Sequence, residues 1–479
     1  MQHERVVRIA VALIAFLALD AQAALPRAVG RAFLDAGIRL DHVAIVVQET
    51  TKPRPLFAYD ANRARSPASV MKLVTTFAAL EILRPGYRWR TKAYLGGPLV
   101  DGELRGDLIL KGDGDPKITV EQWQAFIDDL YAKGVHAIDG RLVLDRSRFA
   151  LPPYDPAAFD GAPDKPYNVG PDALLVNFKS LKVTLAPDGN AGAISLRADP
   201  PLDAVALHAP APSDGACGHG EGASPRVEDR GDRADILFAA PYPRSCGERE
   251  WWVAALDHPH YVHAMFASFF RAIGGRFDGS YAEGRAPQTP PFAVLESPPL
   301  ADIVRDVNKR SNNVMARQLF LTLAAATSPL PATPEQAQHA VMRWMHARKL
   351  AMPGLVIENG SGLSRRERTS AIGMNRLLIA ADRSDVREEF ERSLAVAALD
   401  GTVEHRFRDD AVAGQAQLKT GTLEGVRAIA GYVTDARGRR FTVVAIVNDA
   451  NAARARPALD YLVSWVYANA GSWDPARQR

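Results

Sequence analysis

The segment at residues 69–83 most constrains the fold, because it predicts a mostly apolar helix with a lysine at its start. It contains no glycine or proline, and it places Leu73, Phe77 and Leu80 at helical spacing. Ser69 and Lys72 stand three residues apart, so one helical turn brings both side chains to the same face. A surface lysine needs no special reason, whereas a lysine drawn towards the core predicts a chemical role.

Two further short motifs follow the Ser-Val-Met-Lys of 69–72 in order, namely Ser-Asn-Asn at 311–313 and Lys-Thr-Gly at 419–421. We expect the first at a helix start, the second in a loop between helices, and the third on a strand that leads into a hairpin. Each motif alone also matches a helix cap, a surface lysine or a strand end. Together and in this order they resemble the active-site serine fold of penicillin-binding proteins and serine β-lactamases.

The residue types suit nucleophilic catalysis. A serine hydroxyl is a weak nucleophile that needs a base beside it, and Lys72 would be that base for Ser69. Partial burial, the positive helix terminus and a second lysine would lower the pKa of Lys72 towards the working pH. Ser311 would then relay the proton to the leaving amine. The predicted catalytic residues are therefore Ser69, Lys72 and Ser311.

The remaining motif residues predict substrate binding. Asn313 would hydrogen-bond the substrate backbone, while Lys419 and Thr420 would anchor a substrate carboxylate. Gly421 lacks a side chain, so the substrate can lie along the strand. The backbone N–H of Thr422, together with that of the nucleophilic serine, would form the oxyanion hole.

The spacing of the motifs narrows the resemblance. A long insertion separates the first two motifs, which resembles the low-molecular-mass class C penicillin-binding proteins, the D-alanyl-D-alanine carboxypeptidases and endopeptidases. Three longer stretches agree with that family: Leu-Lys-Gly-Asp-Gly-Asp-Pro at 110–116, Asn-Lys-Arg-Ser-Asn-Asn at 308–313 and Asn-Gly-Ser-Gly-Leu-Ser-Arg at 359–365. The resemblance covers nearly the whole chain after its N-terminal segment.

The resemblance implies an α+β class, with the penicillin-binding-protein and serine β-lactamase transpeptidase fold, an antiparallel sheet with helices. That domain would comprise residues 24–90 and 285–479. Residues 91–284 would form a largely β insert of one or two small domains, which agrees with their alternating strand-like runs and dense turns.

The resemblance also implies the substrate and the inhibitor. Peptidoglycan stem peptides ending in D-Ala-D-Ala, or crosslinks at a D-centre, would acylate Ser69, and β-lactam antibiotics would act as covalent inhibitors. Arg365 matches a cleft-facing arginine of the family, and a cleft-facing aspartate would be Asp160 or Asp164. The balance between carboxypeptidase and endopeptidase activity stays open, as do a homodimer and a loose membrane association.

The N-terminus predicts export. Arg5 and Arg8 precede a short apolar run that ends in a small-x-small site, which predicts a signal peptide cut after Ala23 and a periplasmic protein. In an oxidising compartment Cys217 and Cys246, the only two cysteines, can form a disulfide, although two free thiols remain the alternative.

Net charge and the sequence around three histidines argue against two other functions, nucleic-acid binding and metal-dependent peptide hydrolysis. The chain has 479 residues and a net charge of +3, from 58 basic and 55 acidic residues, which argues against a nucleic-acid partner. His258, His260 and His263 suggest a metal-dependent peptidase as an alternative, but Pro259 and a helix start favour capping and packing, so we expect no metal and no cofactor.

Two alternatives share the serine fold. A β-lactamase would need a base for fast deacylation, and no trustworthy Glu-x-x-x-Asn loop follows the second motif. A non-enzymatic β-lactam sensor would be expected to carry a damaged motif or a signalling span, and the sequence shows neither.

Local patterns predict several elements. We expect a polar interruption in the helical stretch 301–325, and a capping box at Thr333 and Gln336. We expect residues 210–232 to form an exposed loop. The other expected elements are helices at 25–36, 120–133, 333–349 and 458–468, and strand pairs at 42–48 with 56–59 and at 426–434 with 440–447.

Overall fold

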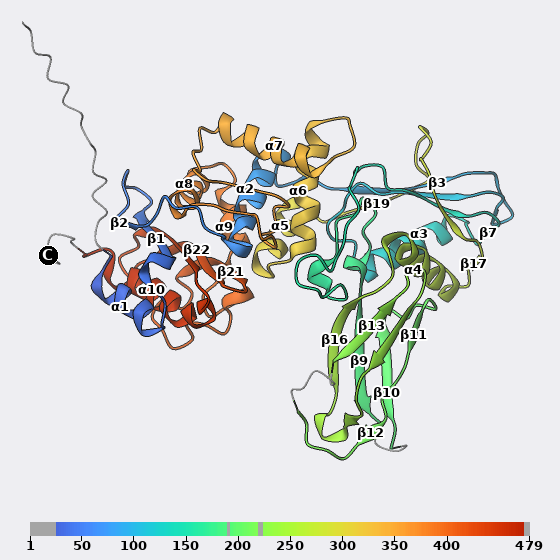
Figure 1. The fold of residues 1–479 in the computed structure, drawn as a ribbon. Coiled ribbons are helices and arrows are strands. Elements are labelled where there is room, and N and C mark those ends of the chain that lie inside the picture. Colours follow the sequence, from blue (N-terminus) through green and yellow to red (C-terminus); the bar gives the residue numbers. More distant parts are fainter. Residues whose placement is uncertain (1–24, 189–191, 219–223, 474–479) are drawn as a thin grey trace, which may run out of the picture.

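The computed structural model describes residues 25–188, 192–218 and 224–473, and shows a helix-and-sheet body from which a β-rich insert extends (Figure 1). The predicted signal peptide lies outside these residues. Within the described ranges, no helix is long and apolar enough to cross a membrane.

A six-stranded antiparallel sheet forms the centre of the body, in the order β2-β1-β23-β22-β21-β20. The central strands are almost continuously apolar, because helices cover both faces of the sheet. The strands are β1 (Val43–Glu49), β2 (Phe57–Tyr59), β20 (Ala395–Val396), β21 (Ala416–Leu423), β22 (Val426–Thr434) and β23 (Arg440–Asn448).

The helices form two layers on this sheet. One face packs against α1 (Arg27–Asp35) and α10 (Arg456–Asn469), and buries the side chains of alternate strand residues such as Ile429 and Val443. The other face, with Ala430 and Val444, packs against the remaining helices. These are α2 (Lys72–Leu83), α5 (Leu300–Lys309), α6 (Asn313–Thr327), α7 (Pro334–Ala347), α8 (Ala371–Asp382) and α9 (Arg387–Ser393).

The first part of the insert contains two small sheets and two helices around one core. One sheet has the order β18-β8-β6-β3-β19 and the other β17-β7-β5-β4. The helices are α3 (Val120–Ala132) and α4 (His258–Ala272), and the strands are β3 (Arg90–Leu95), β4 (Leu99–Val100), β5 (Glu103–Leu104), β6 (Leu108–Lys111), β7 (Ala137–Ile138), β8 (Leu142–Asp145), β17 (Arg276–Phe277), β18 (Tyr281–Glu283) and β19 (Ala293–Glu296).

Strand β19 helps to define where the insert ends. β19 lies beyond residue 284 and pairs with β3, so the sheet of the insert closes later in the chain than expected. We therefore propose that the insert runs from about Arg90 to about Glu296.

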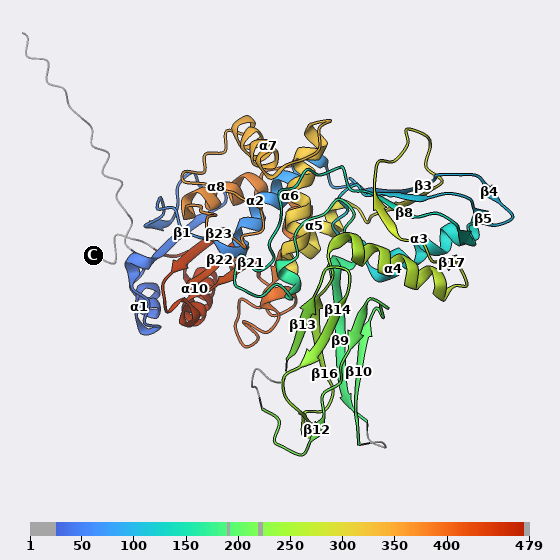
Figure 2. The same ribbon diagram turned by 45° about the vertical axis from the view of Figure 1, so that its right-hand side comes forward.

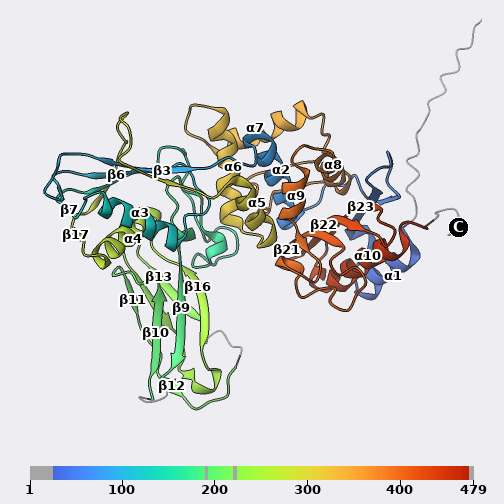
Figure 3. The same ribbon diagram turned by 180° about the vertical axis from the view of Figure 1, so that it is seen from behind.

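The second part of the insert projects away from the body, below α4 (Figures 1, 2 and 3). It contains three sheets, β10-β9-β16, β11-β14-β13 and β12-β15, and a disulfide between Cys217 and Cys246. The strands are β9 (Ser180–Pro187), β10 (Ile194–Asp199), β11 (Val205–Leu207), β12 (Pro212–Ser213), β13 (Pro225–Asp229), β14 (Ala234–Phe238), β15 (Tyr242–Pro243) and β16 (Arg249–Ala254).

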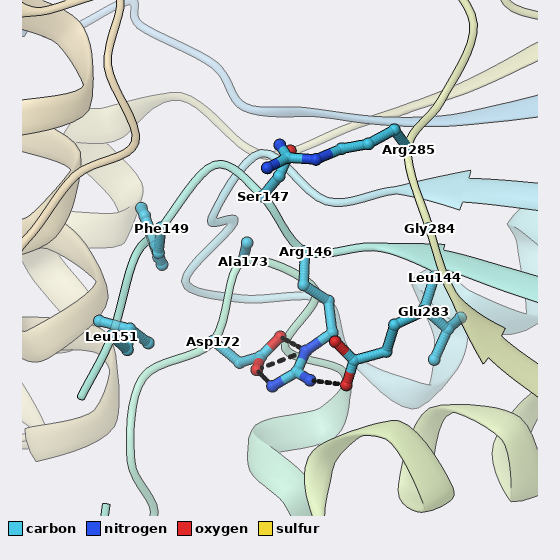
Figure 4. Close-up of a pocket in the computed structure, with 10 residues that line it drawn as sticks. All are labelled: Leu144, Arg146, Ser147, Phe149, Leu151, Asp172, Ala173, Glu283, Gly284 and Arg285. Atoms are coloured by element: carbon cyan, nitrogen blue, oxygen red, sulfur yellow. Dashed lines mark hydrogen bonds and ion pairs between the residues drawn. The ribbon is translucent and has the colours of Figure 1, made fainter. Parts of the chain in front are cut away.

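Polar contacts join the insert to the body. The side chain of Gln318 on α6 accepts a hydrogen bond from the backbone N–H of Asp172 at 2.9 Å and donates to its carbonyl at 2.7 Å. The carboxylate of Asp172 binds Arg146, which also donates to Glu283 at 2.8 Å. Figure 4 shows these three side chains along one side of a junction cavity of about 430 Å³, whose opposite side carries Ser147 and Arg285. None of the residues that line it lines the catalytic cleft described below.

Most locally predicted elements are confirmed within a few residues. The helices at 25–36, 120–133, 333–349 and 458–468 form, both strand pairs form, and the capping box of Thr333 and Gln336 makes both of its hydrogen bonds. The prediction that 210–232 is only a loop was wrong, because β12 and β13 lie within it and pair with β15 and β14. The partner of β12, β15, lies distant in the sequence, whereas β13 forms a local hairpin with β14 and is hidden by its charged residues Arg226, Glu228 and Asp229.

Candidate active site

Ser69 and Lys72 lie at the start of the buried helix, as their spacing predicts. Ser69 belongs to a short 3-10 helix, Ala68–Met71, and α2 begins at Lys72. The two side chains face each other, with Lys72 Nζ 2.8 Å from Ser69 Oγ. Ala68, directly before the serine, has a positive φ of 47°, a strained conformation that is common at functional sites.

Lys72 is completely buried and contacts several polar groups. Its Nζ donates to Asn313 Oδ1 at 2.6 Å and to the carbonyl of Ser361 at 2.5 Å. Burial lowers the pKa of Lys72 well below its ordinary value, and the positive charge of Lys419 lowers it further. The shift has the direction expected from the sequence, although burial is total rather than partial. The amine can therefore be neutral and act as a base.

Ser311 and Lys419 form a second pair. Lys419 Nζ donates to Ser311 Oγ at 2.8 Å and to the carbonyl of Thr420 at 2.9 Å. Burial lowers the pKa of Lys419 to about 7. Ser311 lies between α5 and α6 with a φ of 57°, and the side chain of Asn312 caps α6 by accepting from the N–H of Met315. The polar interruption predicted at this point is therefore the turn that presents Ser311.

Strand β21 lies against the serine segment, and glycine makes this contact feasible. A Cβ on Gly421 would come within 2.5 Å of the Pro67 carbonyl and 3.1 Å of the Ala68 Cβ. The position therefore needs glycine for packing against the nucleophile segment, a reason that sequence reasoning did not give. The predicted oxyanion residue, Thr422, lines the same cleft as Ser69.

The cleft has a volume of about 440 Å³. Arg365 lies on its wall, with its guanidinium 4.6 Å from the centre of the Phe159 ring. Of the two candidate aspartates, Asp160 lines the cleft, whereas Asp164 lies outside it and pairs with Lys165. The cleft is lined by Ser69, Phe159, Asp160, Tyr167, Ser311, Asn313, Leu363, Arg365, Thr402, Thr420, Thr422, Leu423 and Glu424.

Comparison with known proteins identifies the family of this chain. The D-Ala-D-Ala carboxypeptidase 3 (S13) family matches residues 26–468. This chain belongs to the S13 peptidase family. A D-alanyl-D-alanine carboxypeptidase, DacB, from Haemophilus influenzae is 23% identical over 420 residues, 85% of each chain. A D-alanyl-D-alanine carboxypeptidase from an Actinomadura species is 26% identical over 420 residues, 84% of this chain and 77% of the relative.

Solved structures confirm the predicted α+β fold and its extra β sheets. The crystal structure of penicillin-binding protein 4 from Haemophilus influenzae superposes with a TM-score of 0.78 at 21% identity, and covers 92% of this chain and 99% of that one. A predatory peptidoglycan endopeptidase from Bdellovibrio bacteriovorus superposes with a TM-score of 0.52 at 17% identity, and covers 91% of this chain and 94% of that one.

Several residues of this S13 site have no signal in the three motifs. The hydroxyl of Thr420 donates to that of Thr402 at 2.8 Å, and Thr402 comes from a different turn of the chain. Arg317 is buried on α6, where it donates to the carbonyls of Tyr167 and Val169 at 3.3 and 2.7 Å. Arg317 therefore ties the insert loop that carries Tyr167 to the helix that carries Asn313.

Glu367 was also missed, although it organises the backbone beside Lys72. Its carboxylate is fully buried and accepts four backbone N–H bonds, from residues 358–360 and from Gly362. A Cβ on Gly362 would come within 2.0 Å of the Ala68 carbonyl, so this loop packs directly behind the nucleophile. The Asn-Gly-Ser-Gly stretch could have indicated a tight loop, but its buried carboxylate partner follows several residues later.

The histidines considered as metal ligands make other contacts. His258 is fully buried, and burial lowers its pKa to about 4. His260 Nδ1 lies 2.8 Å from Asp257, and His263 Nε2 lies 2.9 Å from the Gly279 carbonyl. Among the residues that the structure describes, no group of three or more histidine, cysteine, aspartate or glutamate side chains is arranged to hold a metal ion.

Proposed function

We propose that this S13 serine peptidase is periplasmic and cleaves D-Ala-D-Ala termini, D-centre crosslinks, or both, in peptidoglycan. The observation that carries the proposal is the fully buried Lys72 amine, 2.8 Å from Ser69 Oγ, with its pKa lowered by burial. The family match supports the reaction class, and the arrangement of the cleft supports the roles assigned below.

Acylation follows from this geometry. Neutral Lys72 accepts the hydroxyl proton as Ser69 Oγ attacks the carbonyl carbon of the penultimate D-alanine. The backbone N–H groups of Ser69 and Thr422 stabilise the negative charge that develops on the carbonyl oxygen. Ser311 passes a proton to the leaving amine, which departs with the terminal D-amino acid. Water then hydrolyses the acyl-serine and restores Ser69.

Substrate binding uses the other residues around the cleft. Lys419 supplies positive charge for the terminal carboxylate, and Thr420 adds a hydroxyl that Thr402 orients at 2.8 Å. Asn313 is placed to bind the peptide backbone while its Oδ1 also holds Lys72. Arg365 and Asp160, which also line the cleft, offer one positive and one negative group to the stem peptide.

Covalent inhibition by β-lactams belongs to the same proposal. A relative's crystal structure, penicillin-binding protein 4 from Haemophilus influenzae, is complexed with a novel β-lactam. A predatory endopeptidase from Bdellovibrio bacteriovorus is described as acylated by penicillin G. In this chain a β-lactam carbonyl would be attacked by Ser69 in the same way, and its ring-opened product would leave slowly.

The disulfide and the predicted signal peptide support export. Cys217 and Cys246 are bonded to each other, and disulfides persist in oxidising compartments such as the bacterial periplasm. The two-free-thiol alternative therefore has no support from the structure.

Intact mass after incubation with benzylpenicillin tests the proposal, with Ser69→Ala as the control. We expect a stable adduct of one drug molecule on the wild type and none on Ser69→Ala. Release of D-alanine from stem pentapeptide and cleavage of crosslinked dimers then assign the two activities. No adduct with the drug intact would contradict the acyl-serine site. No adduct with rapid drug loss would identify a β-lactamase instead.

A further inference from the structure

The outer face of the sheet β10-β9-β16 is polar apart from one large aromatic side chain. Side chains alternate between the two faces of a strand, and the inner face carries Leu181, Val183 and Val253, which are buried. On β16 the outer residues include Glu250 and Trp252, and the Trp252 side chain is 55% exposed. Tryptophan is enriched among the residues that contribute most to binding interfaces.

The preceding residue, Trp251, points to the opposite face of the sheet from Trp252. Its ring is turned to the inner face and packs edge-to-face on Phe238, with a centroid distance of 5.6 Å. Within the described part of the chain, the indole of Trp252 has no hydrogen-bond partner and no aromatic neighbour. Core packing therefore accounts for Trp251 and leaves Trp252 unexplained.

The position of Trp252 connects its face to the catalytic cleft. Ala254 is two residues further along β16, hence on the same face and about 7 Å away. Ala254 packs against Val169 and Val314, and its N–H donates to the Asp164 carbonyl at 2.7 Å. At Ala254 the outer face of β16 is therefore covered by the loop 153–169 and the start of α6, both of which also form walls of the cleft.

The loop 153–169 also carries an exposed aromatic side chain, at the edge of the cleft. Tyr167 belongs to the short 3-10 helix Pro166–Asn168, which packs against β16, and the tyrosine both lines the cleft and is 42% exposed. Figures 1 and 3 show β16 on the side of the projecting insert that is nearest to the catalytic body. Tyr167 and Trp252 thus lie along one surface that leads outward from the cleft.

Polar groups surround the exposed indole. Lys182 stands directly opposite Trp252 in the strand register and forms an ion pair with Glu250 at 3.1 Å. Arg197 follows on the same face, where it pairs across the sheet with Thr184, which is itself buried. A flat aromatic ring bordered by hydrogen-bonding side chains matches a sugar, whose ring has an apolar C–H face and a polar rim.

We propose that this outer face, with Trp252 on its edge strand β16, binds the glycan strand of peptidoglycan while a stem peptide attached to that strand enters the catalytic cleft. The inference rests on the proposed function, since it assumes a peptidoglycan substrate. A protein partner fits less well, because one indole within a charged face offers little of the apolar area that a stable protein interface buries.

The experiment measures co-sedimentation of the mature protein with purified peptidoglycan sacculi. The protein is first acylated with benzylpenicillin, so that binding through the cleft is blocked. We expect Trp252→Ala to weaken this residual binding about tenfold, as truncating a central aromatic contact does. Trp252→Phe, which keeps an aromatic ring, should retain most of it. Tyr461→Ala is the matched control, since Tyr461 is an exposed aromatic residue on α10, which packs on the sheet face opposite α2.

Competition identifies the ligand without any variant. Soluble glycan strands stripped of their stem peptides should displace the acylated wild type from sacculi, whereas free stem peptides should not. The proposal is overturned if Trp252→Ala binds sacculi as tightly as the wild type, or if only peptide-bearing fragments compete. Acylation by benzylpenicillin is the separate readout of the catalytic site. Failure of the wild type to acylate would refute the proposed function, whereas failure of glycan binding alone would not.

Discussion

Replacing Glu367 by glutamine should destabilise the protein, because its carboxylate is an acceptor for four backbone donors at once. Oε1 accepts from the N–H groups of residues 358–360 at 2.9 Å each, and Oε2 accepts from Gly362 at 2.8 Å. The single oxygen of glutamine would accept from the three N–H groups of residues 358–360. Its NH₂ group would then face the N–H of Gly362. Two buried donors would then oppose each other, which costs about 1–3 kcal/mol.

The three bonds that remain would also weaken. A neutral amide oxygen accepts less strongly than a carboxylate, and charge-assisted bonds are roughly twice as strong as neutral ones. Together with the opposed donors, we expect a loss of about 3 kcal/mol in the free energy of unfolding, measured by urea denaturation. Glu358→Gln is the control, because the carboxylate of Glu358 is partly exposed and pairs with exposed Arg366 at 3.0 Å. We expect it to lose about 1 kcal/mol or less.

The same substitution should change catalysis in a way that simple destabilisation does not. The loop held by Glu367 supplies the Ser361 carbonyl that accepts from Lys72, so the maximal acylation rate should fall. The negative charge of Glu367 raises the pKa of Lys72 against the effect of burial. Removing that charge should lower this pKa further, so the neutral amine persists at lower pH. The acid limb of the acylation rate should therefore move to lower pH. Wild-type stability together with an unmoved pH profile would refute this reasoning.

Three other predictions concern charge, packing and covalent linkage. Burial lowers the pKa of Lys419 to about 7, so its positive charge is lost as pH rises through that value. The KM for peptides that end in a carboxylate should therefore increase above about pH 7. The KM for the analogous amides should show no such change. In Gly421→Ala the added Cβ would lie 2.5 Å from the Pro67 carbonyl, so the variant should be acylated by benzylpenicillin at least about tenfold more slowly. The same clash should lower the free energy of unfolding by about 2 kcal/mol. An unchanged acylation rate would contradict this prediction. Replacing Cys217 and Cys246 by serine should lower the free energy of unfolding by about 3 kcal/mol, from the sequence separation of 29 residues, and leave acylation unchanged; equal urea midpoints would argue against it.

Locally encoded features were predicted well. The capping box at Thr333 and the β22–β23 hairpin are made by neighbouring residues, so their sequence patterns are sufficient. The spacing of Ser69 and Lys72 on a helix start is local in the same sense. Long-range pairing was predicted less well. The strand β12 was missed because its partner β15 lies further along the chain, whereas β13, which forms a local hairpin with β14, was missed because its charged residues hide the strand pattern.

In the active site, too, the residues of the motifs were predicted from the sequence, whereas a residue placed by long-range contacts was not. Motif order placed Ser311 and Lys419 in one site with Ser69, but it did not distinguish Asp160 from Asp164, because both lie in one polar loop with no periodic pattern. In the folded chain Asp160 lines the cleft and accepts from the Tyr167 hydroxyl at 2.9 Å. The orientation of that loop depends on Arg317, a residue distant in sequence.

The sequence by itself determined which chemical groups are present and how each is held locally: a serine and a lysine one helical turn apart, a serine at a helix start and a lysine on a strand. Only the tertiary structure decided their reactivity. The depressed pKa of Lys72 arises from complete burial and from the nearby charge of Lys419, and its alignment depends on a carbonyl held by Glu367. Burial and through-space charge depend on which distant segments pack together, and a local sequence pattern does not encode that packing.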